Sequence, residues 1–328
     1  MIEGAVDCPQ GCPGFAKPCS PVAGMVGSPP AEAETYTMAK HRSVILGCGP
    51  RSHDHVRPYG QVEDAEMVAC CDAVDDLRKA FCKRYGLRGY ADAVEMIEAE
   101  KPDLIHLVTR PATRVEQLTM VSDLGVPACI VEKPIATEVR DWRALCDLAA
   151  KTATKIGVGA QWRYSPILGK GREALASGRL GRRLFMESTA GSTICDQGVH
   201  VLDWITSLND ESPAVQVFGA ASGASELDTK HPSPDDTTAQ LLFENGVHCL
   251  WTLGRTAPRV EHAYVAIQRY SHCRVAVYCE RGRVLFEEFG KWEIAGPDGV
   301  ESGENHSMDE WMANNDAAQA GLTRSMLR

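Results

Sequence analysis

Residues 194–204, ICDQGVHVLDW, place three ionisable side chains at helical spacing. Asp196 and His200 lie four residues apart, and Asp203 follows three residues later. Positions i, i+4 and i+7 share one face of a helix, so these side chains would lie together. Imidazole gains and loses a proton near neutral pH, and a neighbouring carboxylate can orient it. The segment is a candidate acid–base site, although Asp196 as a helix N-cap beside an ordinary histidine explains the same spacing.

A glycine-rich loop follows the first apolar run, at residues 42–47. The loop has the first two glycines of the dinucleotide fingerprint G-x-G-x-x-G/A, and Ser52 stands at the third glycine position. In that fingerprint the first glycine forms a tight turn, the second admits the pyrophosphate and the third allows close helix packing. Serine is nearly as small as glycine. We therefore expect the whole loop to contact a dinucleotide cofactor, through Gly47, Cys48, Gly49, Pro50, Arg51 and Ser52.

Asp72 ends the second apolar run, 23 residues after Gly49. A carboxylate at this place in a βαβ unit accepts hydrogen bonds from the adenosine ribose. The same charge repels a 2′-phosphate, and Ala73 and Val74 supply no cation to offset that repulsion. The sequence therefore favours NAD over NADP, and Arg51 is the residue that argues for NADP.

Strand-like and helix-like patterns alternate before residue 161. Short apolar runs predict strands at 42–47, 65–72, 104–109, 127–132 and 155–160. Amphipathic patterns between them predict helices at 75–86, 92–101, 112–125 and 138–152. This alternation predicts βαβ units and an α/β domain with a doubly wound parallel sheet, the Rossmann arrangement.

The pattern changes after residue 161. A helix is expected at 166–181, and strand-like runs then dominate, at 182–190, 214–222, 237–254, 263–271, 274–288 and 291–296. These runs predict a C-terminal α+β domain with an open, mostly antiparallel sheet. Residues 1–40 are rich in Pro, Gly, Ala and Ser, which predicts a disordered extension. The expected division is an extension at 1–40, a nucleotide-binding domain at 41–161 and a second domain at 162–328.

The composition argues against several classes of protein. The chain has 328 residues and a formal net charge of −10, and its Lys and Arg residues are not clustered, so no nucleic-acid surface is expected. No apolar run approaches the roughly 20 residues of a membrane span. Thirteen scattered cysteines indicate reduced thiols in a cytoplasmic protein. No metal site is expected, and for His53, Asp54 and His55 we expect solvent or cofactor contacts instead.

Further motifs identify a family resemblance. Glu132-Lys133-Pro134 ends the fourth predicted strand, Thr109 ends the third, QWRYSP occupies 161–166, and Asp196 to His200 form D-x-G-x-H. With the glycine loop and Asp72, this order resembles the glucose–fructose oxidoreductase/inositol dehydrogenase family, called Gfo/Idh/MocA, over roughly residues 41–290. The resemblance implies a Rossmann domain that binds NAD(P), and a C-terminal substrate-binding domain whose open sheet forms oligomer contacts. It implies an oxidoreductase that acts on sugar or polyol CH–OH groups as a homo-oligomer, a dimer or tetramer.

The resemblance also assigns expected roles to residues. Lys133 lies near the nicotinamide and the substrate hydroxyl, Asp196 positions the substrate, and His200 is the acid–base histidine. Expected cofactor contacts outside the loop are Asp72, Thr109, Glu132, Lys133, Trp162 and Arg163. Expected substrate contacts are Lys133, Gln161, Tyr164, Asp196 and His200. The sequence departs from the family at Ser52, at Arg114, where histidine is frequent, and in a short stretch between Gly181 and Asp196.

These residues suit alcohol oxidation, in which a hydroxyl loses its proton while a hydride leaves the carbon. His200 would accept the proton and Lys133 would stabilise the developing alkoxide, and the two roles could be exchanged. Two alternatives stay open. The same residues could support a glycosidase or lyase that oxidises its substrate only transiently, or the chain could be a non-catalytic nucleotide-binding regulator.

Overall fold

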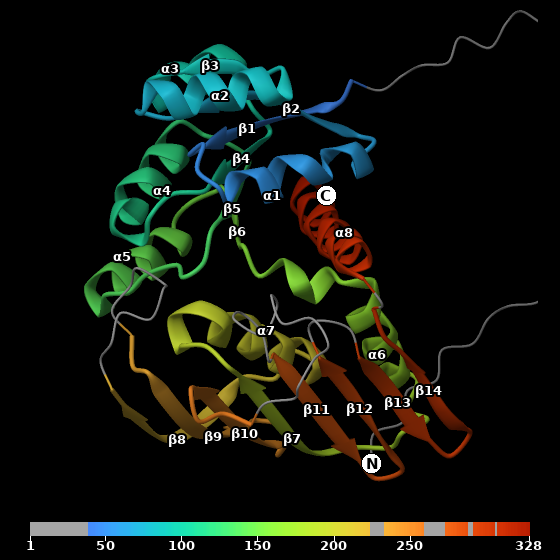
Figure 1. The fold of residues 1–328 in the computed structure, drawn as a ribbon. Coiled ribbons are helices and arrows are strands. Elements are labelled where there is room, and N and C mark those ends of the chain that lie inside the picture. Colours follow the sequence, from blue (N-terminus) through green and yellow to red (C-terminus); the bar gives the residue numbers. More distant parts are fainter. Residues whose placement is uncertain (1–38, 224–232, 259–272, 288–290, 306) are drawn as a thin grey trace, which may run out of the picture. The chain divides into compact units, whose positions relative to one another are not determined.

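Two sheets of different construction organise the structure (Figure 1). One has six strands and the other has eight. The computed structural model describes residues 39–223, 233–258, 273–287, 291–305 and 307–328. All but the last two residues of the extension expected at 1–40 lie outside this part of the chain, as does the whole strand expected at 263–271.

The first sheet has the strand order β3-β2-β1-β4-β5-β6, and all its neighbouring strands are parallel. This is the doubly wound order of a Rossmann fold, so the predicted class is confirmed. All five predicted strands are present, and only β3 is additional because its three residues form no apolar run. The strands are β1 (His41–Leu46), β2 (Ala65–Cys71), β3 (Arg88–Tyr90), β4 (Leu104–Leu107), β5 (Ala128–Val131) and β6 (Lys155–Val158).

Helices cover both faces of this sheet. Alternate side chains of each strand point to opposite faces, so Cys71 joins one core with α3, α4 and α5, and Cys70 joins the other with α1 and α2. The ten described cysteines are all free. The helices are α1 (Ser52–Val56), η1 (Arg57–Gln61), α2 (Asp75–Tyr85), α3 (Ala93–Glu100), η2 (Pro111–Thr113), α4 (Arg114–Asp123) and α5 (Val139–Ala149).

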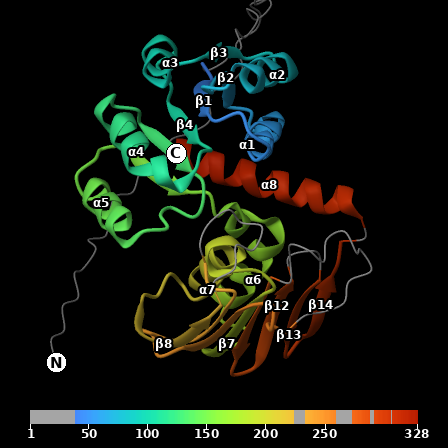
Figure 2. The ribbon, with the colours of Figure 1, turned by 60° about the vertical axis from the view of Figure 1, so that its left-hand side comes forward.

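The last helix, α8 (Met308–Leu327), also packs on the first sheet. Its Leu322 and Met326 form a core with Leu104, Ala128 and Ile130 of β4 and β5. Figures 1 and 2 show α8 running back from the second sheet to the first. The sequence did not predict α8, because its buried face is built largely from small and polar residues that give no apolar stripe.

The second sheet has the order β14-β13-β12-β11-β7-β10-β9-β8. Only β7 and β10 pair in parallel, so the predicted mostly antiparallel sheet is confirmed. Two helices, α6 (Pro166–Ala176) and α7 (Val199–Leu208), contribute to its core. The strands are β7 (Arg183–Ala190), β8 (Ala214–Ser222), β9 (Asp236–Phe243), β10 (His248–Gly254), β11 (Arg274–Cys279), β12 (Gly282–Glu287), β13 (Trp292–Gly296) and β14 (Gly299–Gly303).

One face of the second sheet exposes apolar side chains. Phe218, Gln240 and Leu250 stand in register across β8, β9 and β10, and Phe218 is 80% exposed. Phe185 and His248 form the next cross-strand pair on β7 and β10, and both are exposed. Exposed Phe218, Leu250 and Phe185 side chains on one sheet face indicate a candidate interface.

Candidate active site

The glycine loop joins β1 to α1 in a turn that requires its first glycine. Gly47 has φ +103°, and a Cβ atom there would lie 2.3 Å from the Val108 carbonyl oxygen. A Cβ on Gly49 would meet nothing within 4 Å, so the backbone here is open to an approaching group. Ser52 is fully buried and its hydroxyl donates to the Gly47 carbonyl at 2.8 Å. Serine thus stabilises the turn from inside, and the loop fits a dinucleotide.

Asp72, at the end of β2, is oriented by two backbone N–H groups. Cys48 N donates to Oδ2 and Val74 N donates to Oδ1, both at 2.8 Å. Each oxygen keeps a lone pair for a further donor. The carboxylate therefore fits the hydroxyls of a ribose, and its charge opposes a phosphate at the same place.

Lys133, two residues after β5, contacts a segment of the C-terminal half. Its Nζ lies 2.7 Å from Asp196 Oδ1 and 3.2 Å from the Asp196 carbonyl oxygen. Ser192 Oγ donates to the second carboxylate oxygen at 2.8 Å. Among the described residues, two of the three ammonium N–H groups thus have partners, which leaves one for a ligand. The structure brings together the Lys133 and Asp196 of the predicted site.

His200, in the first turn of α7, is almost fully buried and stacks on Trp162. The ring centroids are 4.1 Å apart, with an interplanar angle of 27°. Trp162 is itself held by α8, because its Nε1 donates to Asn315 Oδ1 at 3.1 Å. His200 Nδ1 is buried and has no hydrogen-bond partner within the described part of the chain.

The charge state of His200 follows from this environment. Burial lowers its pKa well below the usual 6.5, and the positive charges of Lys133 and Arg51 lower it further. His200 is therefore a neutral imidazole at pH 7. A neutral imidazole can accept a proton, and the nearby cations favour passing that proton on.

The three side chains of the 194–204 segment do not form the single helical row that their spacing suggested. Residues Ile194–Gly198 form a π-helical turn before α7 begins, and a π turn closes one residue later than an α turn. Asp196 pairs with Lys133, whereas Asp203 binds the Arg163 guanidinium through both carboxylate oxygens, at 2.6–2.9 Å. Asp196 caps no helix, so the alternative of a simple N-cap is wrong.

The 161–164 segment is tied to its surroundings by side-chain hydrogen bonds. Gln161 donates to Asn315 at 3.4 Å, and Tyr164 donates to Ser325 at 3.1 Å, so both bind α8. Arg163 is occupied by Asp203 and, at 3.1 Å, by Glu211. The predicted cofactor contact of Arg163 and substrate contacts of Gln161 and Tyr164 stay predictions.

Thr109, two residues after β4, is held by two neighbours. Its hydroxyl donates to Gln117 at 2.5 Å, and its carbonyl accepts from Arg114 at 2.8 Å. Arg114 is fully buried, and burial lowers its pKa to about 10, which still leaves it charged at neutral pH. Arg114 therefore fixes the backbone at the end of β4, next to the Gly47 turn.

Glu132 is the centre of a buried cluster that sequence reasoning missed. Its Oε1 accepts from Arg51 Nε at 3.0 Å and from His55 Nε2 at 2.8 Å. His55 is fully buried, so the expectation of solvent or cofactor contacts was wrong for this residue. His106, in the middle of β4, lies 3.0 Å from His55. A histidine within the apolar run LIHLV was the available signal, because a buried polar side chain needs a partner.

Comparison with known families places these features in context. Residues 41–160 match the GFO/IDH/MocA oxidoreductase family, NAD-binding Rossmann fold, and residues 171–285 match the GFO/IDH/MocA C-terminal domain. The chain belongs to this family. The resemblance deduced from the Glu-Lys-Pro and D-x-G-x-H motifs is confirmed.

Several relatives in this oxidoreductase family are sugar or polyol dehydrogenases. D-apiose dehydrogenase of Paraburkholderia graminis is 25% identical over 233 residues, 66% of this chain and 60% of that protein's length. Inositol 2-dehydrogenase of Rhizobium meliloti is 28% identical over 138 residues, 42% of this chain and 41% of that protein's length. Levoglucosan dehydrogenase, solved with NADH and levoglucosan, has a TM-score of 0.71 at 16% identity, covering 88% of this chain and 90% of that chain. The last likeness supports the fold alone.

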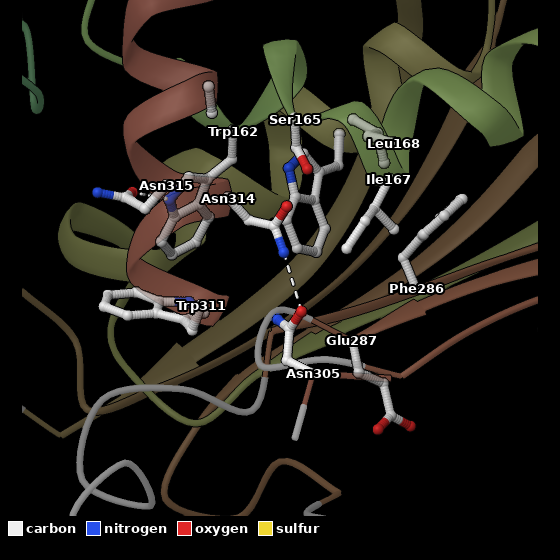
Figure 3. Close-up of a pocket in the computed structure, with 12 residues that line it drawn as sticks. Trp162, Ser165, Ile167, Leu168, Phe286, Glu287, Asn305, Trp311, Asn314 and Asn315 are labelled. Atoms are coloured by element: carbon white, nitrogen blue, oxygen red, sulfur yellow. Dashed lines mark hydrogen bonds between the residues drawn. The ribbon is translucent and has the colours of Figure 1, made fainter. Parts of the chain in front are cut away.

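A small cavity lies next to this family site (Figure 3). It has a volume of about 40 Å³, and Trp162 forms part of its wall together with Trp204 and Trp311. Asn314 donates to Asn305 across it at 2.8 Å. This volume holds a few water molecules and is too small for a sugar.

Within the described residues, no three His, Cys, Asp or Glu side chains are grouped so that they could ligate a metal. None of the helices in the same part of the chain combines the length and hydropathy of a membrane span.

Proposed function

We propose that the protein is an NAD-dependent oxidoreductase that transfers a hydride between the cofactor and a sugar, polyol or related secondary alcohol. The observation that carries this proposal is the 2.7 Å contact between Lys133, which follows a strand of the nucleotide-binding sheet, and Asp196 of the D-x-G-x-H segment. Beside them, Arg51 of the glycine loop acts electrostatically on His200. The similarity to apiose and inositol dehydrogenases supports the substrate class.

The proposed chemistry divides between the cofactor and the chain. When bound, NAD supplies a nicotinamide ring that accepts the hydride. His200, neutral at pH 7, takes the hydroxyl proton of the substrate. Lys133 offers its remaining N–H to the same oxygen and stabilises the negative charge that develops there. Asp196 and Ser192 hold the ammonium in place, so its position is fixed before the substrate arrives.

The low pKa of His200 makes Lys133 essential to this scheme. A weak base removes a hydroxyl proton efficiently only if the alkoxide is stabilised, and the Lys133 ammonium supplies that stabilisation. In the alternative scheme His200 and Lys133 exchange roles, and Lys133 accepts the proton. Lys133 Nζ lies in the same site, so it could serve as that acceptor.

We assign NAD rather than NADP as the cofactor. The oriented Asp72 carboxylate supports this, since it accepts from ribose hydroxyls and repels a phosphate. Arg51, the opposing candidate, is engaged by Glu132 and by Asp54 at 3.0 Å each. A cation already paired with two carboxylates has little charge left for a 2′-phosphate.

A homo-oligomer in the cytoplasm completes the proposal. The exposed apolar face around Phe218 and Leu250 would be covered by the same face of a second copy, as the open sheet of this family implies. The free, mostly buried thiols suit a reducing compartment. We place the domain boundary between residues 161 and 162. Helix α8 follows this boundary in the sequence but packs on the first sheet.

Binding and turnover assays test the function. We expect NADH to raise the melting temperature of the protein more than NADPH does, because a ligand that binds only the folded state stabilises it. With NAD and a panel of sugars and polyols, we expect steady NADH production that Lys133→Met and His200→Ala both abolish. Lys151→Met, at an exposed lysine after α5, is the matched control and should keep full turnover. Product formation without net NADH would support the glycosidase or lyase alternative, and the absence of any turnover would support the regulator.

A further inference from the structure

A row of hydrogen-bonded side chains runs through the nucleotide-binding domain beneath the glycine loop. Tyr59 Oη lies 2.8 Å from His106 Nε2, and His106 Nδ1 lies 3.0 Å from His55 Nδ1. His55 Nε2 then lies 2.8 Å from Glu132 Oε1. Both histidines are fully buried, so bulk solvent does not reach their rings.

The carboxylate at one end fixes the direction of every hydrogen bond in this row. Burial would raise the pKa of Glu132, but the Arg51 charge and the His55 hydrogen bond outweigh it and lower the pKa well below the usual 4.5. An ionised carboxylate only accepts, so His55 Nε2 donates to it. Burial lowers the pKa of both histidines, so each is neutral and carries one N–H. His55 Nδ1 must then accept.

The same reasoning extends to the far end of the row. Because His55 Nδ1 accepts, the proton between the two rings belongs to His106 Nδ1. His106 Nε2 is then an acceptor, and the Tyr59 hydroxyl donates to it. Each proton therefore points toward Glu132, and the two histidines hold opposite tautomers: Nε2–H in His55 and Nδ1–H in His106.

The row ends on the oxygen that also holds the glycine loop. Arg51 Nε donates to the same Glu132 Oε1 at 3.0 Å. Gly159 leaves the space for this oxygen, since a Cβ there would lie 2.9 Å from it. Arg51 directly follows Gly49-Pro50, where the backbone is open to a dinucleotide. The orientation of Glu132 therefore decides where the Arg51 charge lies in the cofactor site.

We propose that Tyr59 and His106 are positioning residues: by fixing the tautomer of His55 they orient Glu132, which holds Arg51 in the glycine loop where the cofactor binds. Neither touches the reacting atoms. The expected effect of Tyr59 and His106 on NADH binding rests on the proposed function. The expected tautomers of His55 and His106 do not depend on it.

The tautomers can be read directly. In protein labelled with ¹⁵N-histidine, protonated and unprotonated ring nitrogens have widely separated chemical shifts. We expect the wild-type protein at pH 7 to show one buried histidine as Nε2–H and another as Nδ1–H, assigned from the spectra of His55 and His106 variants. The same tautomer on both residues, or a charged imidazole on either, would overturn the proposal.

Paired variants separate positioning from general packing. Tyr59→Phe removes the 2.8 Å hydrogen bond between Tyr59 and His106. Tyr85→Phe removes a hydrogen bond of the same length between Tyr85 and His53. His53 lies on α1, as His55 does, but is not part of the row. We expect the first variant to weaken NADH binding by roughly two- to ten-fold, as one lost hydrogen bond implies. The second should leave it unchanged.

Substitutions of His106 test rescue. Asparagine places an N–H close to the position of His Nδ1, so His106→Asn should keep the Nε2–H tautomer of His55 and near-normal NADH affinity. His106→Leu removes the donor, so His55 should show mixed tautomers and weaker NADH binding. Equal NADH affinity in His106→Asn and His106→Leu would overturn the proposal. An equal loss of NADH affinity in Tyr59→Phe and Tyr85→Phe would overturn it as well. If the wild-type protein failed to bind NADH, the proposed function would be refuted. The tautomers of His55 and His106 could still be measured and would test the hydrogen-bonded row by themselves.

Discussion

Replacing Glu132 by glutamine tests the buried charge on which the site depends. Glutamine keeps the shape and one oxygen acceptor but removes the charge. A hydrogen bond to a charged group contributes about 1.5–3 kcal/mol, and a neutral one about 0.5–1.5 kcal/mol. Glu132 Oε1 accepts two such bonds, from Arg51 and His55. The change therefore weakens both bonds by about 1 kcal/mol each.

Solvent access reduces the share that belongs to Arg51. Its side chain is 33% exposed and also binds Asp54 at 3.0 Å, so water and Asp54 compensate for part of the lost partner. The buried His55 has no such compensation. We therefore expect Glu132→Gln to lower the free energy of unfolding by about 1–2 kcal/mol at pH 7. This is less than the roughly 3–5 kcal/mol that an uncompensated buried charge costs.

The pH dependence gives the sharper test. The pKa of Glu132 is lowered in the folded state from a usual value of 4.5, so its stabilisation is complete above that value and is lost as the pH falls. At pH 4 the unfolded carboxylate is largely protonated while the folded one is still ionised. The difference between wild type and Glu132→Gln should then be about 0.8 kcal/mol smaller than at pH 7.

Urea unfolding at pH 7, 5 and 4 measures these differences. Glu100→Gln is the matched control, because Glu100 is also buried and binds two arginines, Arg42 and Arg88, but lies away from the glycine loop. Both variants should lose stability, and only Glu132→Gln should lose NADH affinity. Wild-type stability of Glu132→Gln at pH 7, or an equal deficit at pH 7 and pH 4, would contradict the reasoning.

Three further changes have definite expected outcomes. Gly47→Ala should abolish NADH binding, measured by fluorescence titration, because its Cβ would lie 2.3 Å from the Val108 oxygen; normal affinity would contradict the assigned turn. Leu322→Ala should lower the free energy of unfolding by about 2–4 kcal/mol in urea titrations, because it opens the core between α8 and the first sheet. Ser192→Ala frees one oxygen of Asp196 and should reduce kcat/KM by roughly three- to ten-fold while NADH affinity is unchanged; a selective loss of NADH affinity would argue against this role.

Much of the fold was predictable because its signals are local. In the Rossmann domain, apolar runs and helical patterns predicted strands and helices within a few residues of their observed ends. The outline of the site was also predictable, since Lys133, Asp196 and the glycine loop stand in recognisable motifs. Lys133 and Asp196 do meet, as the motifs implied.

The missing parts depend on contacts between distant segments. Helix α8 buries small and polar residues, so its own sequence pattern does not indicate that it covers β4 and β5. The tautomer-fixing row needs Tyr59, His106 and Glu132 to meet from three separate elements, which spacing along the chain cannot reveal. The π turn at 194–198 was equally hidden, because its sequence is compatible with an ordinary helix.

The position of α8 has a consequence for synthesis on the ribosome. An N-terminal domain usually folds as soon as it emerges, but here Leu104, Ala128 and Ile130 stay uncovered until Leu322 and Met326 have been translated. The whole second sheet is made during that interval. The nascent nucleotide-binding half therefore exposes this apolar surface to solvent until α8 is available to cover it.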